Sequence, residues 1–204
     1  MGTGTGIWAC EFGDEFPGCE VTGVDVSPMQ PVMVPPNVKF EVDNAEDEWT
    51  WPDNTFDYIH LRGLLGSIKD WDKFYRQAYR CLKPGGWIEH HDQGVRWFSE
   101  SGAITEESAL GQYPKVFWKA GELMGQTFRI VDDDVPRQSM GKAGFANIDS
   151  HDFRMYYGLW PTDRRAKAIG NCSKMTFEQD PEGIYHLTFA SVLVGLHTNI
   201  LLCR

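Results

Sequence analysis

The sequence has too few basic residues to suit nucleic acids and no apolar run that suits membranes. Its 19 lysines and arginines are outnumbered by 29 aspartates and glutamates, which leaves a formal net charge of −10. Phosphate repulsion opposes binding to DNA or RNA, and the same charge argues against a polybasic membrane anchor. The most apolar run, Phe189–Leu196, is too short to span a bilayer, and no signal peptide is visible. We therefore predict neither a nucleic-acid nor a membrane partner.

Cysteine pairs are also missing. The five cysteines are scattered, odd in number and form no C-x-x-C pair. This pattern argues against a disulfide scaffold or a zinc site and favours reduced thiols in the cytoplasm or nucleus. We predict no metal ligands. The length of 204 residues and the 42% hydrophobic composition suit one globular domain with a sizeable core.

Along the chain, short runs that are β-branched or that alternate apolar and polar residues are interspersed with helical patterns. This order predicts a Rossmann-like α/β fold with a doubly wound, mostly parallel sheet. We find no internal repeats. The predicted strands are Cys19–Ser27, Val38–Asn44, Phe56–Arg62, Trp87–Asp92 and Phe145–Gly158, and the predicted helices are Ile7–Phe16, Trp71–Gly86, Glu106–Phe128 and a tail helix from Pro181.

A glycine-rich loop, MGTGTGIW, opens the chain. Glycines at a strand end let the backbone approach a ligand closely. The G-x-G-x-G spacing of Gly2, Gly4 and Gly6 differs from the dinucleotide G-x-G-x-x-G, which matches weakly from Gly4 to Ala9. No Gly-Lys-Ser/Thr follows, so a phosphate P-loop is excluded. Asp25, near the end of the next strand, stands where a ribose-binding carboxylate belongs. Together these features predict a nucleoside ligand.

Five segments, in chain order, resemble the successive motifs of the class I, seven-strand S-adenosylmethionine (SAM)-dependent methyltransferases. They are GTGTGIWA, GVDVSPMQP, FEVDNAEDEWTW, FDYIHLRGLLGSIKDW and LKPGGWIE. The subgroup they resemble is the fungal LaeA-like group, linked to secondary metabolism and its regulation. The resemblance implies SAM as cofactor, and a small secondary metabolite or a protein as methyl acceptor. It implies one domain over 1–204, with a SAM-binding core at about 1–92 and a substrate and C-terminal region at about 93–204.

The resemblance also implies roles for single residues. The glycine loop would pass the methionine part of SAM, the loop's threonines would donate to its carboxylate, and Asp25 would bind the ribose. Asn44 stands where the family usually has aspartate, and its amide can still accept from the adenine amine and donate to N1. Met29 or Trp49 would pack on the adenine ring. The cofactor-binding residues predicted in this way are Gly2, Thr3, Gly4, Thr5, Gly6, Asp25, Met29, Asp43, Asn44 and Ala45.

Histidines close two of the predicted strands. His60 lies near the end of one strand, and His90 and His91 lie near the end of the next, close to the expected position of the methyl group. If the acceptor is a hydroxyl, His90 or His91 could act as general base, because histidine titrates near neutral pH. Packing is the alternative role, and the transfer itself requires no base, because the cofactor carries the reactivity. His60 and His91 are the candidate catalytic residues.

The family's first strand lies directly before the glycine loop, where this chain offers only Met1. The strands ending at Asp25 and Arg62 would then lack their shared partner. Each unsatisfied backbone group costs about 1–3 kcal/mol. We therefore expect a methyltransferase chain that is truncated at its N-terminus and binds SAM poorly.

Two other functions stay open. A non-catalytic, methyltransferase-like protein that regulates by binding a protein partner fits the same motifs. An NAD(P)-dependent oxidoreductase is disfavoured by the glycine spacing. Tyr79 and Lys83 match a Tyr-x-x-x-Lys pair, but they lie on a predicted helix away from the strand ends.

Overall fold

The computed structural model describes residues 1–179, so the predicted helix from Pro181 lies outside the described residues. No helix in this part of the chain is long and apolar enough to cross a membrane. The elements are α1 (Ile7–Glu15), β1 (Val21–Asp25), β2 (Val38–Val42), β3 (Phe56–Arg62), α2 (Trp71–Cys81), β4 (Leu82–His91), α3 (Ala109–Met124), α4 (Val135–Ala143) and α5 (Arg164–Gln179).

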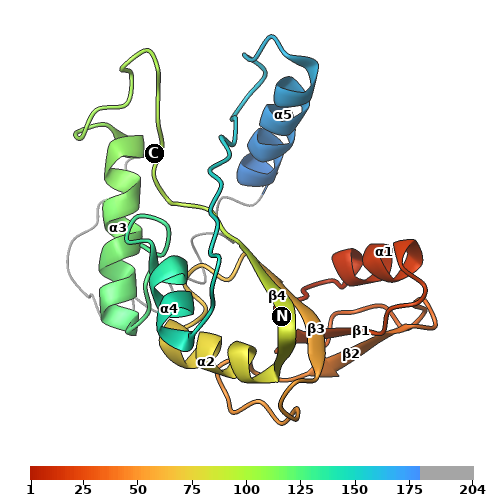
Figure 1. Ribbon diagram of the computed structural model, residues 1–204. Helices are drawn as coiled ribbons and strands as arrows, with labels where there is room; N and C mark the ends of the chain where they lie inside the picture. The colour runs from red at the N-terminus through yellow and green to blue at the C-terminus, as the bar shows by residue number, and fades with distance from the viewer. Residues whose placement is uncertain (180–204) are drawn as a thin grey trace. The chain divides into compact units, whose positions relative to one another are not determined.

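The four strands form two parallel pairs (Figure 1). The strand β1 pairs with β2 from Val21↔Val38 to Asp25↔Val42. The strand β3 pairs with β4, where His60 lies opposite Glu89. Parallel strands need a crossover connection, and α2 supplies it between β3 and β4. This arrangement confirms the predicted Rossmann-like α/β class with parallel strands.

Residues 1–3 lie between β1 and β3. The N–H of Thr3 donates to the carbonyl of Val24 at 2.9 Å, and the amine of Met1 donates to the carbonyl of His60 at 2.8 Å. This segment occupies the place where the sequence predicted a missing strand. Across residues 1–179 no strand fills that place. The start of the glycine loop is thereby held at the carboxyl ends of β1 and β3.

The helix α2 covers one face of β3 and β4. Asp70 caps its N-terminus by accepting from the N–H of Lys73 at 2.7 Å. Its apolar residues recur every three to four positions, and Phe74 and Tyr75 pack with Leu61 of β3 in the core. The helix α4 lies beside α2 (Figure 1).

The helix α1 covers part of the other face of β3. Side chains alternate between the two faces of a strand. Ile59 and Leu61 therefore face the core that contains α2, and His60 between them faces α1. The ring of Trp8 stacks on His60 with centroids 3.9 Å apart.

Several predicted boundaries differ from the structure. The helix predicted over Trp71–Gly86 ends at Cys81, because Leu82 is extended and pairs with Phe56 in the sheet. The predicted strand Phe145–Gly158 is wrong, since these residues form neither helix nor strand. The alternating pattern alone was misleading there, since Phe153, one of its apolar positions, is 86% exposed. The helices α4 and α5 were not predicted, and α3 is shorter than the predicted helix.

The chain divides into two compact units. Among residues 1–179, the first holds 1–121 and 125–148, and the second holds 122–124 and 149–179. The division falls near residue 148, whereas the sequence suggested a change of role near 92. The organisation as a single domain stays a prediction.

Candidate functional site

A cavity of about 350 Å³ lies at the carboxyl ends of β1 and β2. The end of β1, the segment after β2, the loop after β3 and the start of the glycine loop all contribute to its wall. Ligands of open α/β sheets bind at this edge, and the volume is in the range of small-molecule sites.

Six of the ten predicted cofactor-binding residues line this cavity. The other four do not: the N–H of Thr3 is bonded to β1, Thr5 is exposed, Gly6 is buried, and Met29 is 57% exposed. Trp49, the other candidate for packing on adenine, is only 5% exposed and belongs to the core. The six lining residues are Gly2, Gly4, Asp25, Asp43, Asn44 and Ala45.

The glycines of the loop serve different purposes. Gly4 has φ +55° and no heavy atom within 4 Å of the place where a Cβ would stand. Since Gly4 lines the cavity, the missing side chain leaves room for a ligand beside the backbone. Gly6 has φ +79°, and a Cβ there would lie 2.9 Å from Cε1 of Phe40 and closer still to its Cζ. Gly6 is therefore needed for packing against β2, not for lining the cavity.

The carboxylate of Asp25 holds the glycine loop in place. Its Oδ2 accepts from the N–H of Gly4 at 2.7 Å, and its Oδ1 accepts from the N–H of Ser27 at 3.0 Å. The side-chain amide of Gln30 adds another hydrogen bond to the loop by donating to the carbonyl of Gly4 at 2.7 Å. Each carboxylate oxygen keeps a further lone pair for a ligand hydroxyl. Asp25 can thus position the loop and bind a ligand at once.

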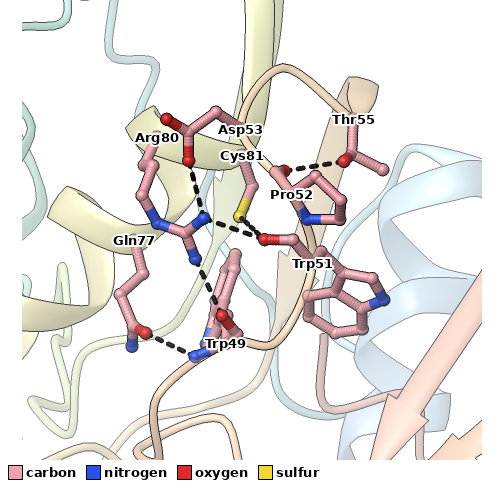
Figure 2. A network of polar contacts seen from close by, with 8 residues as sticks. All are labelled: Trp49, Trp51, Pro52, Asp53, Thr55, Gln77, Arg80 and Cys81. Atoms are coloured by element: carbon pink, nitrogen blue, oxygen red, sulfur yellow. Dashed lines mark hydrogen bonds and ion pairs between the residues drawn. The ribbon is translucent and has the colours of Figure 1, made fainter.

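The segment after β2 is held against α2 (Figure 2). The indole N–H of Trp49 donates to the carbonyl of Ala45 at 3.1 Å. The backbone N–H of Trp49 donates to Oε1 of Gln77 at 2.6 Å. The guanidinium of Arg80 donates to the carbonyls of Trp49 and Trp51, each at 2.8 Å. Ala45, on the cavity wall, is therefore positioned through Trp49 by two residues of α2.

Arg80 also forms an ion pair with Asp53 at 2.9 Å. The hydrogen bond to this carboxylate raises the pKa of Arg80 above its ordinary value. The acidic, turn-rich segment thereby gains a cationic partner that sequence reasoning did not assign to it.

Half of the cavity wall was missed by sequence reasoning. Most of the missed residues belong to the loop after β3, within the quoted motif FDYIHLRGLLGSIKDW. The carboxyl ends of parallel strands meet at one edge, so the residues after β3 could have been predicted from the same rule that selected Asp25. The missed lining residues are Val24, Val26, Gly63, Leu64, Ser67 and Ile68.

A buried polar chain supports this loop. The N–H of Leu64 donates to Oδ2 of Asp92 at 2.9 Å. His90 lies between Asp92, at 3.2 Å from its Nε2, and the hydroxyl of Tyr75, at 2.6 Å from its Nδ1. Burial, and then the charge of Asp92, raise the pKa of Tyr75 above its ordinary value. His90, an alternative general base from the sequence, is thus a packed histidine that helps to position a cavity loop.

His60 and His91 do not line the cavity. They lie with Glu89 on the face of β3 and β4 that carries α1, opposite the face of His90. Nδ1 of His60 is 3.1 Å from Oε2 of Glu89, and Nε2 of His91 is 2.9 Å from its Oε1. The catalytic role of His60 and His91 stays a prediction.

Hydrogen bonding influences the charge of the cluster formed by His60, Glu89 and His91. The hydroxyl of Tyr58 donates to Glu89, and this bond, followed by those of His91 and His60, lowers the pKa of Glu89 to about 2. Burial lowers the pKa of His60, although Glu89 opposes the shift. Glu89 is therefore a carboxylate at neutral pH.

Fold and cavity place the chain among Rossmann-like α/β proteins with a ligand site at the carboxyl edge of the sheet. The comparison with known families is more specific. The profile of the family described as "Methyltransferase domain" matches residues 1–150. The chain belongs to this methyltransferase family.

Curated relatives confirm the predicted resemblance to the LaeA-like group. Methyltransferase pytC of Aspergillus terreus is 37% identical over 95% of this chain and 59% of its own length. The secondary metabolism regulator LAE1 of Cochliobolus heterostrophus is 33% identical over 98% of this chain and 64% of its own. The protein-methionine methyltransferase laeA of Emericella nidulans is 25% identical over 94% of this chain. The chain thus spans about three fifths of the first two relatives.

Solved structures agree on the fold. Two structures of phosphoethanolamine N-methyltransferase 2 of Haemonchus contortus match with TM-scores of 0.54 and 0.57, each at 24% identity. Each match covers 95% of this chain and 42% of the solved chain. One of those structures contains S-adenosyl-L-methionine, and the other contains phosphomonomethylethanolamine and S-adenosylhomocysteine.

Proposed function

We propose that this chain binds SAM in the cavity at the ends of β1 and β2 and serves methyl transfer to a small secondary metabolite or a protein. The observation that carries the proposal is the convergence of Gly4, Asp25 and Asn44 on one cavity. These residues come from three separate motifs, spread over about forty positions of a methyltransferase-family chain.

The chemistry of the cavity fits the parts of SAM. Asp25 offers carboxylate oxygens to the ribose hydroxyls, and a charged acceptor makes the stronger bond. Asn44 offers an amide that can both donate to and accept from an adenine edge. Leu64 and Ile68 supply apolar wall, and Gly4 leaves backbone access beside open space. All five residues fit the proposed cofactor.

When bound, SAM supplies an electrophilic methyl group on its sulfonium sulfur. The residues of the chain are left with binding and orientation, which can provide much of the rate in such a transfer. Asp25 would fix the cofactor to the glycine loop, because the same carboxylate accepts from Gly4. The loop held by Asp92 would fix the opposite wall through Leu64.

The acceptor is proposed by analogy with the relatives. One is a protein-methionine methyltransferase by name, and another is a regulator of secondary metabolism by name. The first name supports a protein acceptor, and the second supports a link to secondary metabolism, where a small metabolite could accept the methyl group. We propose a cytoplasmic or nuclear location. The regulatory name also supports the second candidate function, a non-catalytic protein that acts through a protein partner.

We predict that Asp25→Ala weakens binding of S-adenosylhomocysteine by about ten- to a hundredfold, because hydrogen bonds to a charged group contribute about 1.5–3 kcal/mol. Isothermal titration calorimetry or an NMR titration measures this affinity. Since Asp25 also bonds Gly4 and Ser27, circular dichroism must show that the variant is folded. Glu20→Ala is the matched control: this acid is exposed, lies just before β1 and is expected to change nothing.

The binding measurement and an assay for methylated product together distinguish the possible outcomes. If the wild type shows no saturable binding, or if a folded Asp25→Ala variant binds equally well, the SAM site is wrong. If SAM binds but no methylated product forms with extracts of metabolites or proteins, the non-catalytic candidate gains support. Micromolar affinity of the wild type would also contradict the expectation, from the sequence, that the chain binds SAM poorly.

A further inference from the structure

The cluster of His60, Glu89 and His91 has the composition of a metal site. Two imidazoles and one carboxylate meet on the face of β3 and β4 that carries α1. None of the three lines the cavity assigned to SAM. We propose that these residues bind a divalent transition-metal ion, with Zn²⁺ as the best match, at a second site separate from the cofactor cavity.

The distances allow one ion to reach all three side chains. The potential ligand atoms, one from each residue, all lie within 4.8 Å of one another. Ligands about 2.1 Å from a tetrahedral Zn²⁺ stand roughly 3.4 Å apart. Nδ1 of His60 lies 3.1 Å from Oε2 of Glu89 and Nε2 of His91 lies 2.9 Å from its Oε1, so both histidines already approach the same carboxylate at about this spacing. Rotation of the half-exposed side chain of His91 would complete the site.

The types of ligand favour a particular class of ion. Two histidines and one glutamate are a recurring zinc ligand set, and two histidines with one carboxylate also bind other transition metals. Mg²⁺ and Ca²⁺ prefer oxygen ligands and full octahedral or larger shells, which the two imidazoles do not supply. The negative charge of Glu89 would partly neutralise the ion.

Neighbouring side chains already orient two of the three ligands. The hydroxyl of Tyr58 donates to Oε2 of Glu89, and the ring of Trp8 stacks on His60 with an angle of 7° between the planes. Outer contacts of this kind fix the direction of a metal ligand and commonly change metal affinity ten- to a hundredfold. The side chains of Glu89 and His91 are 47% and 48% exposed, so an ion and its waters can enter from solvent.

The site changes the interpretation of the two histidines. An ion on Nδ1 of His60 and Nε2 of His91 would use the lone pairs that a general base needs. Metal binding and a general-base role at these nitrogens therefore exclude one another. No local sequence motif indicates this site, because His60 and Glu89 are 29 positions apart and the pairing of β3 with β4 brings them together.

Calorimetric titration of the full chain with Zn²⁺ tests the proposal. The wild type is expected to bind Zn²⁺ saturably and Mg²⁺ not at all. Glu89→Gln and His91→Ala should each weaken Zn²⁺ binding at least about tenfold, since each removes a ligand. His151→Ala controls for an exposed histidine, and Cys19→Ser controls for an exposed thiol. Neither control should change the affinity.

Two results would overturn the metal site. The first is a wild type without saturable Zn²⁺ binding, in which case the three side chains form only a hydrogen-bonded cluster. The second is Zn²⁺ binding that survives both Glu89→Gln and His91→Ala. Both residues are half-exposed, so the variants should fold, and circular dichroism checks this. If His91→Ala is unfolded, His91→Gln replaces it with the same expected loss.

Discussion

Gly6→Ala is expected to lower the free energy of unfolding by about 2–4 kcal/mol. Two costs add. Gly6 has φ +79°, a left-handed conformation that costs an L-residue about 1–2 kcal/mol. The new Cβ would also meet the ring of Phe40 at 2.9 Å and closer. That ring cannot easily retreat toward β1, because it lies equally close to the Cβ position of Gly23, at 2.5 Å.

Two glycine variants separate these costs. Gly125 ends α3 with φ +68° and has no heavy atom within 4 Å of its Cβ position, so Gly125→Ala should show the conformational cost alone. Gly18 has an equally open Cβ position and no left-handed conformation, so Gly18→Ala should change stability by less than about 0.5 kcal/mol. Urea unfolding of the three variants measures the differences. If Gly6→Ala costs no more than Gly125→Ala, the packing of Phe40 against Gly6 is not a constraint.

The features that the sequence predicted well depend on local pattern. Asp25 and the segment Asp43–Ala45 each adjoin a strand whose end could be recognised from a few residues, and the glycine loop was recognised from its own G-x-G-x-G spacing. Because parallel strands end at one edge, local recognition was enough to bring six predicted residues to one cavity. The strands β1, β2 and β3 were predicted for the same reason, as β-branched or alternating runs.

The features that the sequence missed depend on contacts between distant segments. Whether a histidine faces a cavity, a helix or the core is decided by the face of the strand it occupies. His90 and His91 are neighbours in sequence, yet one is bonded to Tyr75 in the core and the other to Glu89 on the opposite face. Met29 illustrates the same limit: its position after β1 was predicted, but it is 57% exposed and does not line the cavity.

The segment between β2 and β3 is ordered by contacts with a distant helix, and we call these contacts, made by Gln77 and Arg80, the clamp. Residues 43–55 form neither helix nor strand, and they still carry part of the cavity wall. Their order comes from α2, about thirty positions further along the chain, through Gln77 and Arg80 (Figure 2). The local sequence pattern of this segment does not predict these partners.

Gln77→Leu tests this clamp and is expected to lower the free energy of unfolding by about 2–4 kcal/mol. Gln77 is 8% exposed. Its Oε1 accepts from the N–H of Trp49 at 2.6 Å, and its Nε2 donates to the carbonyl of Asp47 at 2.8 Å. Leucine has a similar volume but satisfies neither group, and each unpaired buried group costs about 1–3 kcal/mol. Urea unfolding measures the change.

Loss of the Gln77 hydrogen bonds should also affect the cavity. Trp49 holds Ala45 through its indole N–H, so freeing the backbone of Trp49 should loosen the wall that Ala45 provides. We therefore expect Gln77→Leu to weaken binding of S-adenosylhomocysteine under conditions where the variant is fully folded. Arg76→Ala is the matched control, because Arg76 lies on the exposed side of α2 one residue before Gln77. Weakened binding in Gln77→Leu but not in Arg76→Ala would tie the cavity to the clamp, whereas equal effects would show that α2 influences the site only through overall stability.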